Sequence, residues 1–300
     1  MRIQLDNPDY SSKEPTDIHR ESFHDCLFRI ITMKTSIINP FLLRVLIAGL
    51  GLILAGRVAA QTFTNLYNFT GFTDGSTPLA GLIVSGNTLY GAADSGGSAF
   101  NGTVFKANLN GTGLTNLHTF TATLDPDYTN GDGAYPGGVL LLSGTTLYGT
   151  ASQGGSSGNG TVFAVNTNGT VFTNLHSFTG PLYSGPAIIN TDGADPVAGL
   201  ILSGSTLYGT ASQGGSSGNG TVFAINTNGT SFTNLHSFNY ASDGANPQGS
   251  LILIGSTLYG TANQAAVLAL GLCSPSTPTA RVLRICIVSI TATELIRRSD

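Results

Sequence analysis

The tripeptide Leu-Tyr-Gly occurs four times in this chain, and its spacing constrains the possible folds more than any other feature. The copies begin at Leu89, Leu147, Leu207 and Leu258, so successive copies are 58, 60 and 51 residues apart. Intervals of this size are typical of repeat proteins in which each repeat is one supersecondary unit. We therefore expect a tandem array, and not the two domains that 300 residues would otherwise suggest.

Each copy lies within a longer constant pattern. Along the chain this pattern runs Asp-Gly-x-x-Pro, an apolar run, Ser-Gly or a related pair, Leu-Tyr-Gly, Gly-Gly, Gly-Thr-Val-Phe, Asn-Gly-Thr and Thr-Asn-Leu-His. Short runs of β-branched and aromatic residues between glycine-containing turns favour antiparallel meanders, and helical periodicity is absent. In the third copy the pattern predicts four strands, at 197–202, 206–210, 220–225 and 230–238.

Four strands in each repeat of this length are typical of a β-propeller blade, whose faces are buried by neighbouring blades. The sequence therefore predicts an all-β fold: an incomplete β-propeller-like array of four-stranded antiparallel blades, about three full and a partial fourth, over residues 61–264. Residues 63–70 are expected to form an unpaired outer strand, able to complete the last blade by ring closure. The blades are expected at about 79–121, 137–179 and 197–239, with the fourth beginning near Gln248.

The motifs resemble two known kinds of repeat. An apolar strand, a Leu-Tyr strand ending in Gly-Gly and an aromatic strand are similar to the kelch blade, although the kelch tryptophan is missing throughout. The combination of Leu-Tyr-Gly-Thr-Ala-Ser-Gln-Gly-Gly, Gly-Thr-Val-Phe and Asp-Gly-Ala-x-Pro more closely resembles the GloVer-type tandem repeats of exported bacterial proteins, over about residues 61–262. This resemblance implies an exported, surface-associated repeat protein and no particular reaction.

Residues 33–60 have the pattern of a secretory signal peptide. Lys34 precedes a twelve-residue apolar run from Val45 to Gly56, and Val58-Ala59-Ala60 places small residues before a mature start at Gln61. The alternative is a transmembrane anchor, but twelve helical residues rise only about 18 Å against a hydrocarbon core of about 30 Å. We expect a secreted or cell-surface protein that contacts the membrane only during export.

The two ends of the chain do not fit the repeat. Residues 1–32 precede the signal pattern, so we expect Met33 to be the true start and residues 1–32 to be disordered. If residues 265–296 are read in another frame, with synonymous codons chosen freely, they permit almost the same sequence as that from Gly214 to Tyr240. We predict a frame-shifted, non-native tail and at least one further blade in the natural protein. The alternative for the tail is a membrane anchor, which its four arginines disfavour.

The composition of residues 61–262 excludes some classes of function. They contain eight Asp, a single basic residue, Lys106, and no Glu, Arg, Cys, Trp or Met. Such an acidic, arginine-free surface would repel phosphate backbones, so we expect no nucleic-acid partner. The three cysteines lie outside this segment, so neither a disulfide framework nor a cysteine metal site can hold the repeats together.

The aspartates and histidines that recur in each repeat have structural interpretations beside functional ones. The Asp of Asp-Gly is expected to form a turn, while a calcium site would require several carboxylates from different loops. Each His is expected to have a packing role on an outer strand, because Tyr67 replaces it in the first copy. The residues concerned are Asp74, Asp132, Asp192 and Asp243, the further acidic residues Asp125, Asp127 and Asp195, and the histidines His118, His176 and His236.

Two other motifs are interpreted as turns. Asn-Gly-Thr at Asn110, Asn168 and Asn228 matches the glycosylation acceptor but is also a strong hairpin signal. The glycine-rich segment 153–160 has neither the lysine nor the following helix of a phosphate-binding loop.

The sequence predicts no enzyme and no catalytic, cofactor-binding or metal residue. The repeats lack the Glu and the clustered Arg of most glycosidase and sialidase sites, and no nucleophile-elbow pattern occurs, although a Ser-His-Asp triad stays open. We predict a non-catalytic scaffold or adhesion protein; the alternative is a glycan-binding or glycan-acting extracellular propeller. Recognition of a glycan or surface protein is expected in the variable loops 122–136 and 180–196, with Tyr128, Tyr135 and Tyr183 as candidate contacts.

Overall fold

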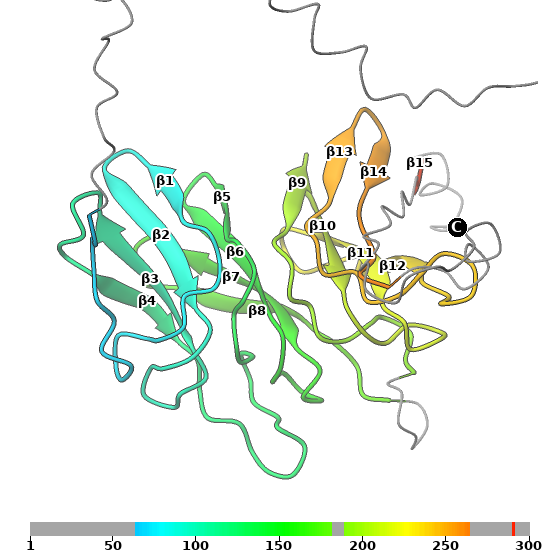
Figure 1. The fold of residues 1–300 in the computed structure, drawn as a ribbon, viewed down its shortest axis with the longest axis horizontal. Helices are drawn as coiled ribbons and strands as arrows, with labels where there is room; N and C mark the ends of the chain where they lie inside the picture. Colours follow the sequence, from blue (N-terminus) through cyan, green and yellow to red (C-terminus); the bar gives the residue numbers. More distant parts are fainter. Residues whose placement is uncertain (1–63, 182–188, 265–289, 292–300) are drawn as a thin grey trace, which may run out of the picture. The chain divides into compact units, whose positions relative to one another are not determined.

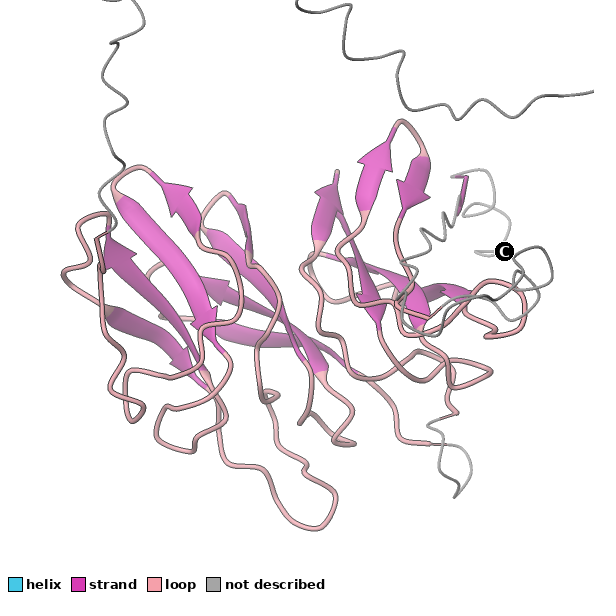
Figure 2. Cartoon of the chain, in the orientation of Figure 1, coloured by secondary structure: helices cyan, strands magenta, loops and turns pink. Residues whose placement is uncertain are grey.

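The computed structural model describes residues 64–181, 189–264 and 290–291. The predicted signal peptide, residues 1–32, Tyr183 and all of the predicted tail except Ile290 and Thr291 lie outside these residues. The described residues form strands and loops without a helix (Figure 2). In that part of the chain no helix is long and apolar enough to cross a membrane.

Three four-stranded sheets follow one another along the chain, and each is an antiparallel meander in chain order (Figure 1). We call them blades 1, 2 and 3, and the three-stranded sheet that follows is blade 4. Blade 1 contains β1 (Ile83–Ser85), β2 (Thr88–Ala93), β3 (Thr103–Asn108) and β4 (Thr115–Thr119); blade 2 contains β5 (Leu141–Ser143), β6 (Thr146–Ala151), β7 (Thr161–Asn166) and β8 (Phe172–Ser177). Blade 3 contains β9 (Ile201–Ser203), β10 (Thr206–Ala211), β11 (Thr221–Asn226) and β12 (Thr233–Ser237), and blade 4 contains β13 (Ile252–Ile254), β14 (Thr257–Tyr259) and β15 (Ile290–Thr291). The predicted fold class, an incomplete propeller-like array of three full blades and a partial fourth, is confirmed.

The first strand of blade 3 is shorter than the sequence predicts. In blade 3 a strand was expected over 197–202, but β9 begins only at Ile201. The preceding residues contact the neighbouring blade: the Thr150 hydroxyl donates to the Ala198 carbonyl at 2.9 Å, and a Cβ on Gly199 would stand 2.8 Å from the Val139 carbonyl oxygen. These backbone groups therefore bond and pack between blades and not within a sheet.

Residues 64–70 do not form the outer strand that was predicted, since no strand is assigned there. They nevertheless supply the side chains that such a strand would contribute. The Phe69 ring lies 5.2 Å from that of Phe105, as the Phe120 ring, directly after β4, lies 5.4 Å from that of Phe163. Ring closure by this segment stays a prediction.

The apolar cores lie between blades. Phe120 of blade 1 and Phe163 of blade 2 are fully buried in one cluster, and Phe178 and Phe223 are its counterparts between blades 2 and 3. Burying one such side chain contributes about 2–3 kcal/mol, and a single blade would leave these faces exposed. The glycine of Leu-Tyr-Gly makes room for this packing, because a Cβ on Gly209 would stand 2.6 Å from the Phe223 ring.

Candidate functional site

The recurring His and Asp residues meet at the joints between blades. Nε2 of His118 lies 2.9 Å from Oδ2 of Asp132, and His176 and Asp192 are 2.9 Å apart in the same way. His236 and Asp243 repeat the pair at 2.6 Å. In the first repeat the Tyr67 hydroxyl donates to Asp74 at 2.8 Å, so the tyrosine has the bonding role of the histidine as well as its place in the motif.

Sequence reasoning treated the His and the Asp as separate features and missed this pairing. The available signal was that both residue types occur once in each repeat, while the loop between them varies in length. The pairs join sequence positions 14 and 16 residues apart at the first two joints and 7 apart at the third. Because the number of residues between the His and the Asp differs from pair to pair, their spacing in the sequence does not predict that they form the same hydrogen bond.

Asp132 and Asp192 each accept further hydrogen bonds from the threonine that lies two residues beyond the end of the preceding outer strand. The amide and hydroxyl of Thr179 both donate to Asp192, and Thr121 does the same for Asp132. Burial raises the pKa of these two carboxyl groups, but the hydrogen bonds from the histidine and the threonine outweigh it, so the pKa of each is lowered. In the described part of the chain no three His, Cys, Asp or Glu side chains converge as metal ligands.

The histidine rings also pack on the next blade. His118 stacks on Phe172 with ring centroids 3.7 Å apart, and His176 stacks on Phe232 at 3.8 Å. The histidine therefore connects its own outer strand to the Asp-Gly loop by a hydrogen bond and to the neighbouring blade by its ring face. This arrangement gives the histidine and aspartate a structural role at each joint.

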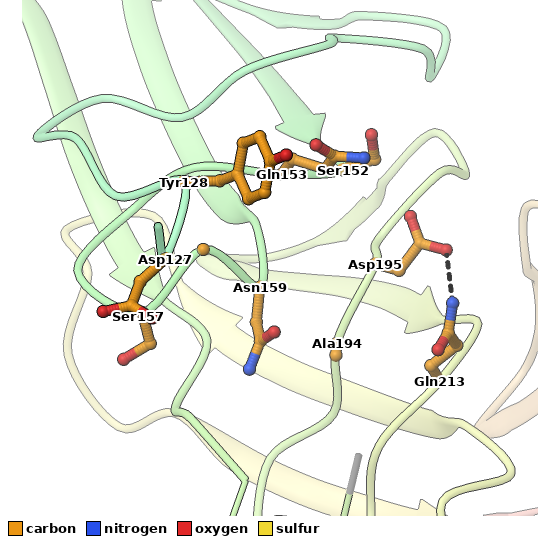
Figure 3. A pocket seen from close by; sticks show the side chains of 10 residues that line it. Asp127, Tyr128, Ser152, Gln153, Ser157, Asn159, Ala194, Asp195 and Gln213 are labelled. Atoms are coloured by element: carbon orange, nitrogen blue, oxygen red, sulfur yellow. Dashed lines mark hydrogen bonds between the residues drawn. The ribbon is translucent and has the colours of Figure 1, made fainter. Parts of the chain in front are cut away.

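A polar pocket of about 550 Å³ lies beside the joint between blades 2 and 3. From the blade 2 side it is lined by Asp127, Tyr128, Ser152, Gln153, Ser157, Gly158 and Asn159, and from the blade 3 side by Ala194, Asp195 and Gln213. Figure 3 shows Asp195 and Gln213 on one side of the pocket, with Tyr128, Asp127 and Asn159 on the other. We call this pocket the 2–3 groove.

The segment containing Asp127 and Tyr128 is specific to the connection between blades 1 and 2. It turns back on itself through a bridge between Leu124 and Thr129. It lies directly over the glycine-rich loop of blade 2, because a Cβ on Gly158 would stand 2.2 Å from the Asp127 carbonyl oxygen. Tyr128 has a positive φ of 53° and is 57% exposed. The groove therefore combines a loop unique to one joint with loops common to all blades.

Asp195 occupies a backbone position that recurs at every joint. It is the fourth residue of Asp-Gly-Ala-Asp-Pro, and the same place is taken by Thr77, Tyr135 and Asn246 in the other copies. All four have positive φ, between 54° and 59°. In blade 3 the Asp195 amide donates to the Asn159 carbonyl at 3.0 Å, and its carbonyl accepts from the Ser212 amide at 3.0 Å. The position is thus bonded to two successive blades while its side chain varies.

The carboxylate of Asp195 has two donors on one oxygen. The Ser212 hydroxyl and the Gln213 side-chain amide donate to Oδ2 at 2.8 and 3.1 Å. Among the described residues no hydrogen bond to its Oδ1 is found. The groove lining includes two carboxylates and no basic side chain; Lys106, the one Lys or Arg in the described part, donates to the Thr167 carbonyl on blade 2.

The other candidate residues are distributed over the joints and turns. Asn110, Asn168 and Asn228 each accept hydrogen bonds from the amide and hydroxyl of the Thr two positions on, as expected of a turn. Asp125 and Asp127 are exposed, and only Asp127 borders the groove. Of the candidate tyrosines Tyr128 lines the groove, Tyr135 is half-buried at the joint between blades 1 and 2, and Tyr183 lies outside the described residues.

The sequence matches the family model of the Gloeobacter/Verrucomicrobia repeat over residues 48–189 and 182–291. This match confirms the GloVer-type resemblance, whereas the kelch-like detail stays a prediction. No curated protein matches the sequence.

Several solved structures are similar to the fold at low sequence identity. A nidogen/laminin complex matches with 15% identity over 59% of this chain and 52% of the other, at a TM-score of 0.37. The protein described as TolB from Agrobacterium tumefaciens matches with 12% identity over 61% and 53%, at a TM-score of 0.35. The GH74 enzyme of Niastella koreensis matches with 18% identity over 67% and 28%, at a TM-score of 0.40. The chain spans about half the length of the first two proteins and 28% of the third.

Proposed function

The chain belongs to the Gloeobacter/Verrucomicrobia repeat family, and we propose that it is an exported, non-catalytic repeat scaffold that recognises a surface partner through the loops connecting its blades. The observation that carries this proposal is the contrast between strands and loops. Strands β6 and β10 have the identical sequence TLYGTA, and β7 and β11 differ at one position of six. The connections that precede these blades differ in sequence, and both of them border the 2–3 groove.

Recognition by variable loops on a constant scaffold has a physical basis. Strands at blade interfaces are fixed by packing, since changes there open cavities or create clashes. Loops at the surface tolerate change and can present new side chains without altering the core. A repeat that keeps its strands and varies its connections is therefore suited to binding and not to one fixed chemistry.

The state of three recurring aspartates argues against their acting as general acids, in keeping with a non-catalytic scaffold. A general acid that works near neutral pH needs a raised carboxyl pKa. Asp74, Asp132 and Asp192 have pKa values shifted in the opposite direction, held down by hydrogen bonds from their own joints. The hydrogen bonds therefore stabilise each of these aspartates in its anionic form, in a structural position.

Export is the part of the proposal that the sequence from Lys34 to Ala60 supports. Protein collected from outside the expressing bacterial cells should begin at Gln61 when its N-terminus is sequenced. A chain that keeps its N-terminus and stays in the membrane fraction would contradict export.

Recognition can be tested by exchanging one loop for another from the same protein. The joint between blades 3 and 4 connects Asn239 to Asp243 through Tyr-Ala-Ser, whereas residues 122–131 make the corresponding connection between blades 1 and 2. We expect the full chain to adhere to surfaces coated with bacterial cell wall or extracellular polysaccharide, and a variant with Tyr-Ala-Ser in place of residues 122–131 to lose that adhesion. A matched control replaces Thr170 by Ser in an exposed turn away from the groove.

Two results would contradict the proposal. Adhesion that is unchanged in the loop exchange, in a variant with wild-type unfolding behaviour, would remove this connection as a recognition element. Hydrolysis of any of the offered sugars by the full chain would overturn the non-catalytic assignment.

A further inference from the structure

We propose that the 2–3 groove binds a neutral, hydroxyl-rich oligosaccharide, with Asp195 as the principal hydrogen-bond acceptor and Tyr128 as the stacking surface. This inference rests on the proposed recognition function and assigns its ligand class and its residues. The groove volume of about 550 Å³ lies within the range typical of small-ligand sites.

The rigid placement of Asp195 is the first argument. Its φ of +57° is unfavourable for a residue with a side chain, and it persists because the backbone amide and carbonyl are bonded to Asn159 and Ser212. The following Pro196 packs against blade 2, where a Cβ on Gly160 would stand 2.5 Å from the proline ring. The carboxylate is therefore presented at a fixed place and loses little further freedom when a ligand binds.

The chemistry of the lining is the second argument. Asp195 uses Oδ2 for Ser212 and Gln213, and its Oδ1, which has no hydrogen bond among the described residues, can accept one from a ligand hydroxyl. The exposed side chains of Gln153 and Gln213 each offer a donor and an acceptor, which suits hydroxyl groups that both give and receive hydrogen bonds. Tyr128, more than half exposed, presents an aromatic ring that can cover the apolar face of a sugar.

The charge of the groove is the third argument. Asp127 and Asp195 are both acidic, and the lining has no Lys or Arg to balance them. Uronic acids, phosphates and sialylated sugars would be repelled, whereas a neutral sugar would not. The groove should therefore discriminate neutral from acidic oligosaccharides.

The residue at the position of Asp195 differs from joint to joint, and we assign ligand specificity to this position. The place of Asp195 is taken by Tyr135 at the joint between blades 1 and 2 and by Asn246 at the joint between blades 3 and 4, in the same backbone conformation. The backbone bonds are also the same, since the Asn246 amide donates to the Asn219 carbonyl at 2.9 Å. This position changes the chemistry of a joint without changing its geometry.

The experiment measures binding of defined oligosaccharides to the full chain by calorimetry. The probes are the neutral cellohexaose, mannohexaose, xylohexaose and maltohexaose, and the acidic hexagalacturonate. The variants are Asp195→Asn and Tyr128→Ala, and the control is Asp94→Asn, which removes the same charge outside this groove. Asp195→Asn is expected to fold, because asparagine already occupies this backbone position at Asn246.

At least one neutral probe should bind the wild-type chain, and hexagalacturonate should not. Asp195→Asn should weaken that binding about tenfold or more, because a hydrogen bond to a charged acceptor is stronger than one to a neutral acceptor. Tyr128→Ala should weaken it to a comparable extent, and Asp94→Asn should leave it unchanged. Asp195→Asn should also reduce the discrimination against hexagalacturonate.

Three results would overturn the assignment. Neutral binding that survives Asp195→Asn and Tyr128→Ala would place the site elsewhere and leave the proposed recognition function standing. Binding that disappears with a calcium chelator would show that the carboxylates hold a cation. Adhesion in the loop-exchange assay without binding of any oligosaccharide would refute the ligand class alone, whereas failure of both assays would refute the proposed function as well.

Discussion

Replacing Asp192 by alanine tests whether the His–Asp joints stabilise the array because they are buried. The Asp192 side chain is 7% exposed and accepts from His176 at 2.9 Å, from the Thr179 amide at 3.0 Å and from the Thr179 hydroxyl. Its removal leaves these donors without an acceptor in a site with little access to water. One lost hydrogen bond to a charged group costs about 1.5–3 kcal/mol, and the three are not additive, so we expect a loss of about 3 kcal/mol.

The Tyr67–Asp74 pair, which precedes blade 1, provides the matched control. Asp74 accepts from the Tyr67 hydroxyl at 2.8 Å and from the Thr70 amide at 2.9 Å, but these bonds are exposed to solvent. Water can replace Asp74 in an Asp74→Ala variant, so its effect on stability should be a small fraction of that of Asp192→Ala. Asp192→Asn should lie between the two, because the amide oxygen can still accept from Thr179.

Urea unfolding followed by circular dichroism gives the free energies of unfolding and the slopes with denaturant. A changed slope in Asp192→Ala would show that blades 2 and 3 had stopped unfolding together, which is a second signature of a broken joint. Equal losses in Asp192→Ala and Asp74→Ala would refute the reasoning, since burial would then not decide the value of the joint.

Further predictions concern pH, the packing glycine and a turn. Because the pKa values of Asp132 and Asp192 are lowered on folding, their contribution to stability is complete above the unfolded value of about 3.9 and is lost as the pH falls through the lower folded value. Unfolding measured from pH 6 to pH 3 should therefore show stability declining below about pH 4, more gently in a variant with Asn at both positions; an equally steep decline there would contradict the assignment. Gly209→Ala should cost about 2 kcal/mol because its Cβ would stand 2.6 Å from the Phe223 ring. Gly204→Asn, in a turn with open space around it and a φ of +58°, should cost less than about 1 kcal/mol; thermal melts in which Gly204→Asn is the more damaging would contradict this ranking.

Much of the fold was determined locally and could be predicted from the sequence. Gly204, Gly214 and Gly229 all have positive φ, as their places in the predicted turns require. The alternation in Thr206–Ala211 and the β-branched run in Thr221–Asn226 became adjacent strands in register. These features depend on residues within a few positions of one another, so a single repeat contains the information for its own blade.

The contacts between repeats were decided by the tertiary structure. Ile201–Ser203 is a short strand because the residues before it bond and pack against blade 2, and His176 meets Asp192 across a loop whose length differs from joint to joint. The 2–3 groove likewise has in its lining Tyr128 of one connection and Asp195 of another, 67 positions later in the sequence. Spacing along a chain fixes periodicity and turns, but the approach of two blades depends on packing and hydrogen bonds between segments that the spacing does not relate. For that physical reason the blades could be predicted from the sequence, while the joints and the groove beside them could not.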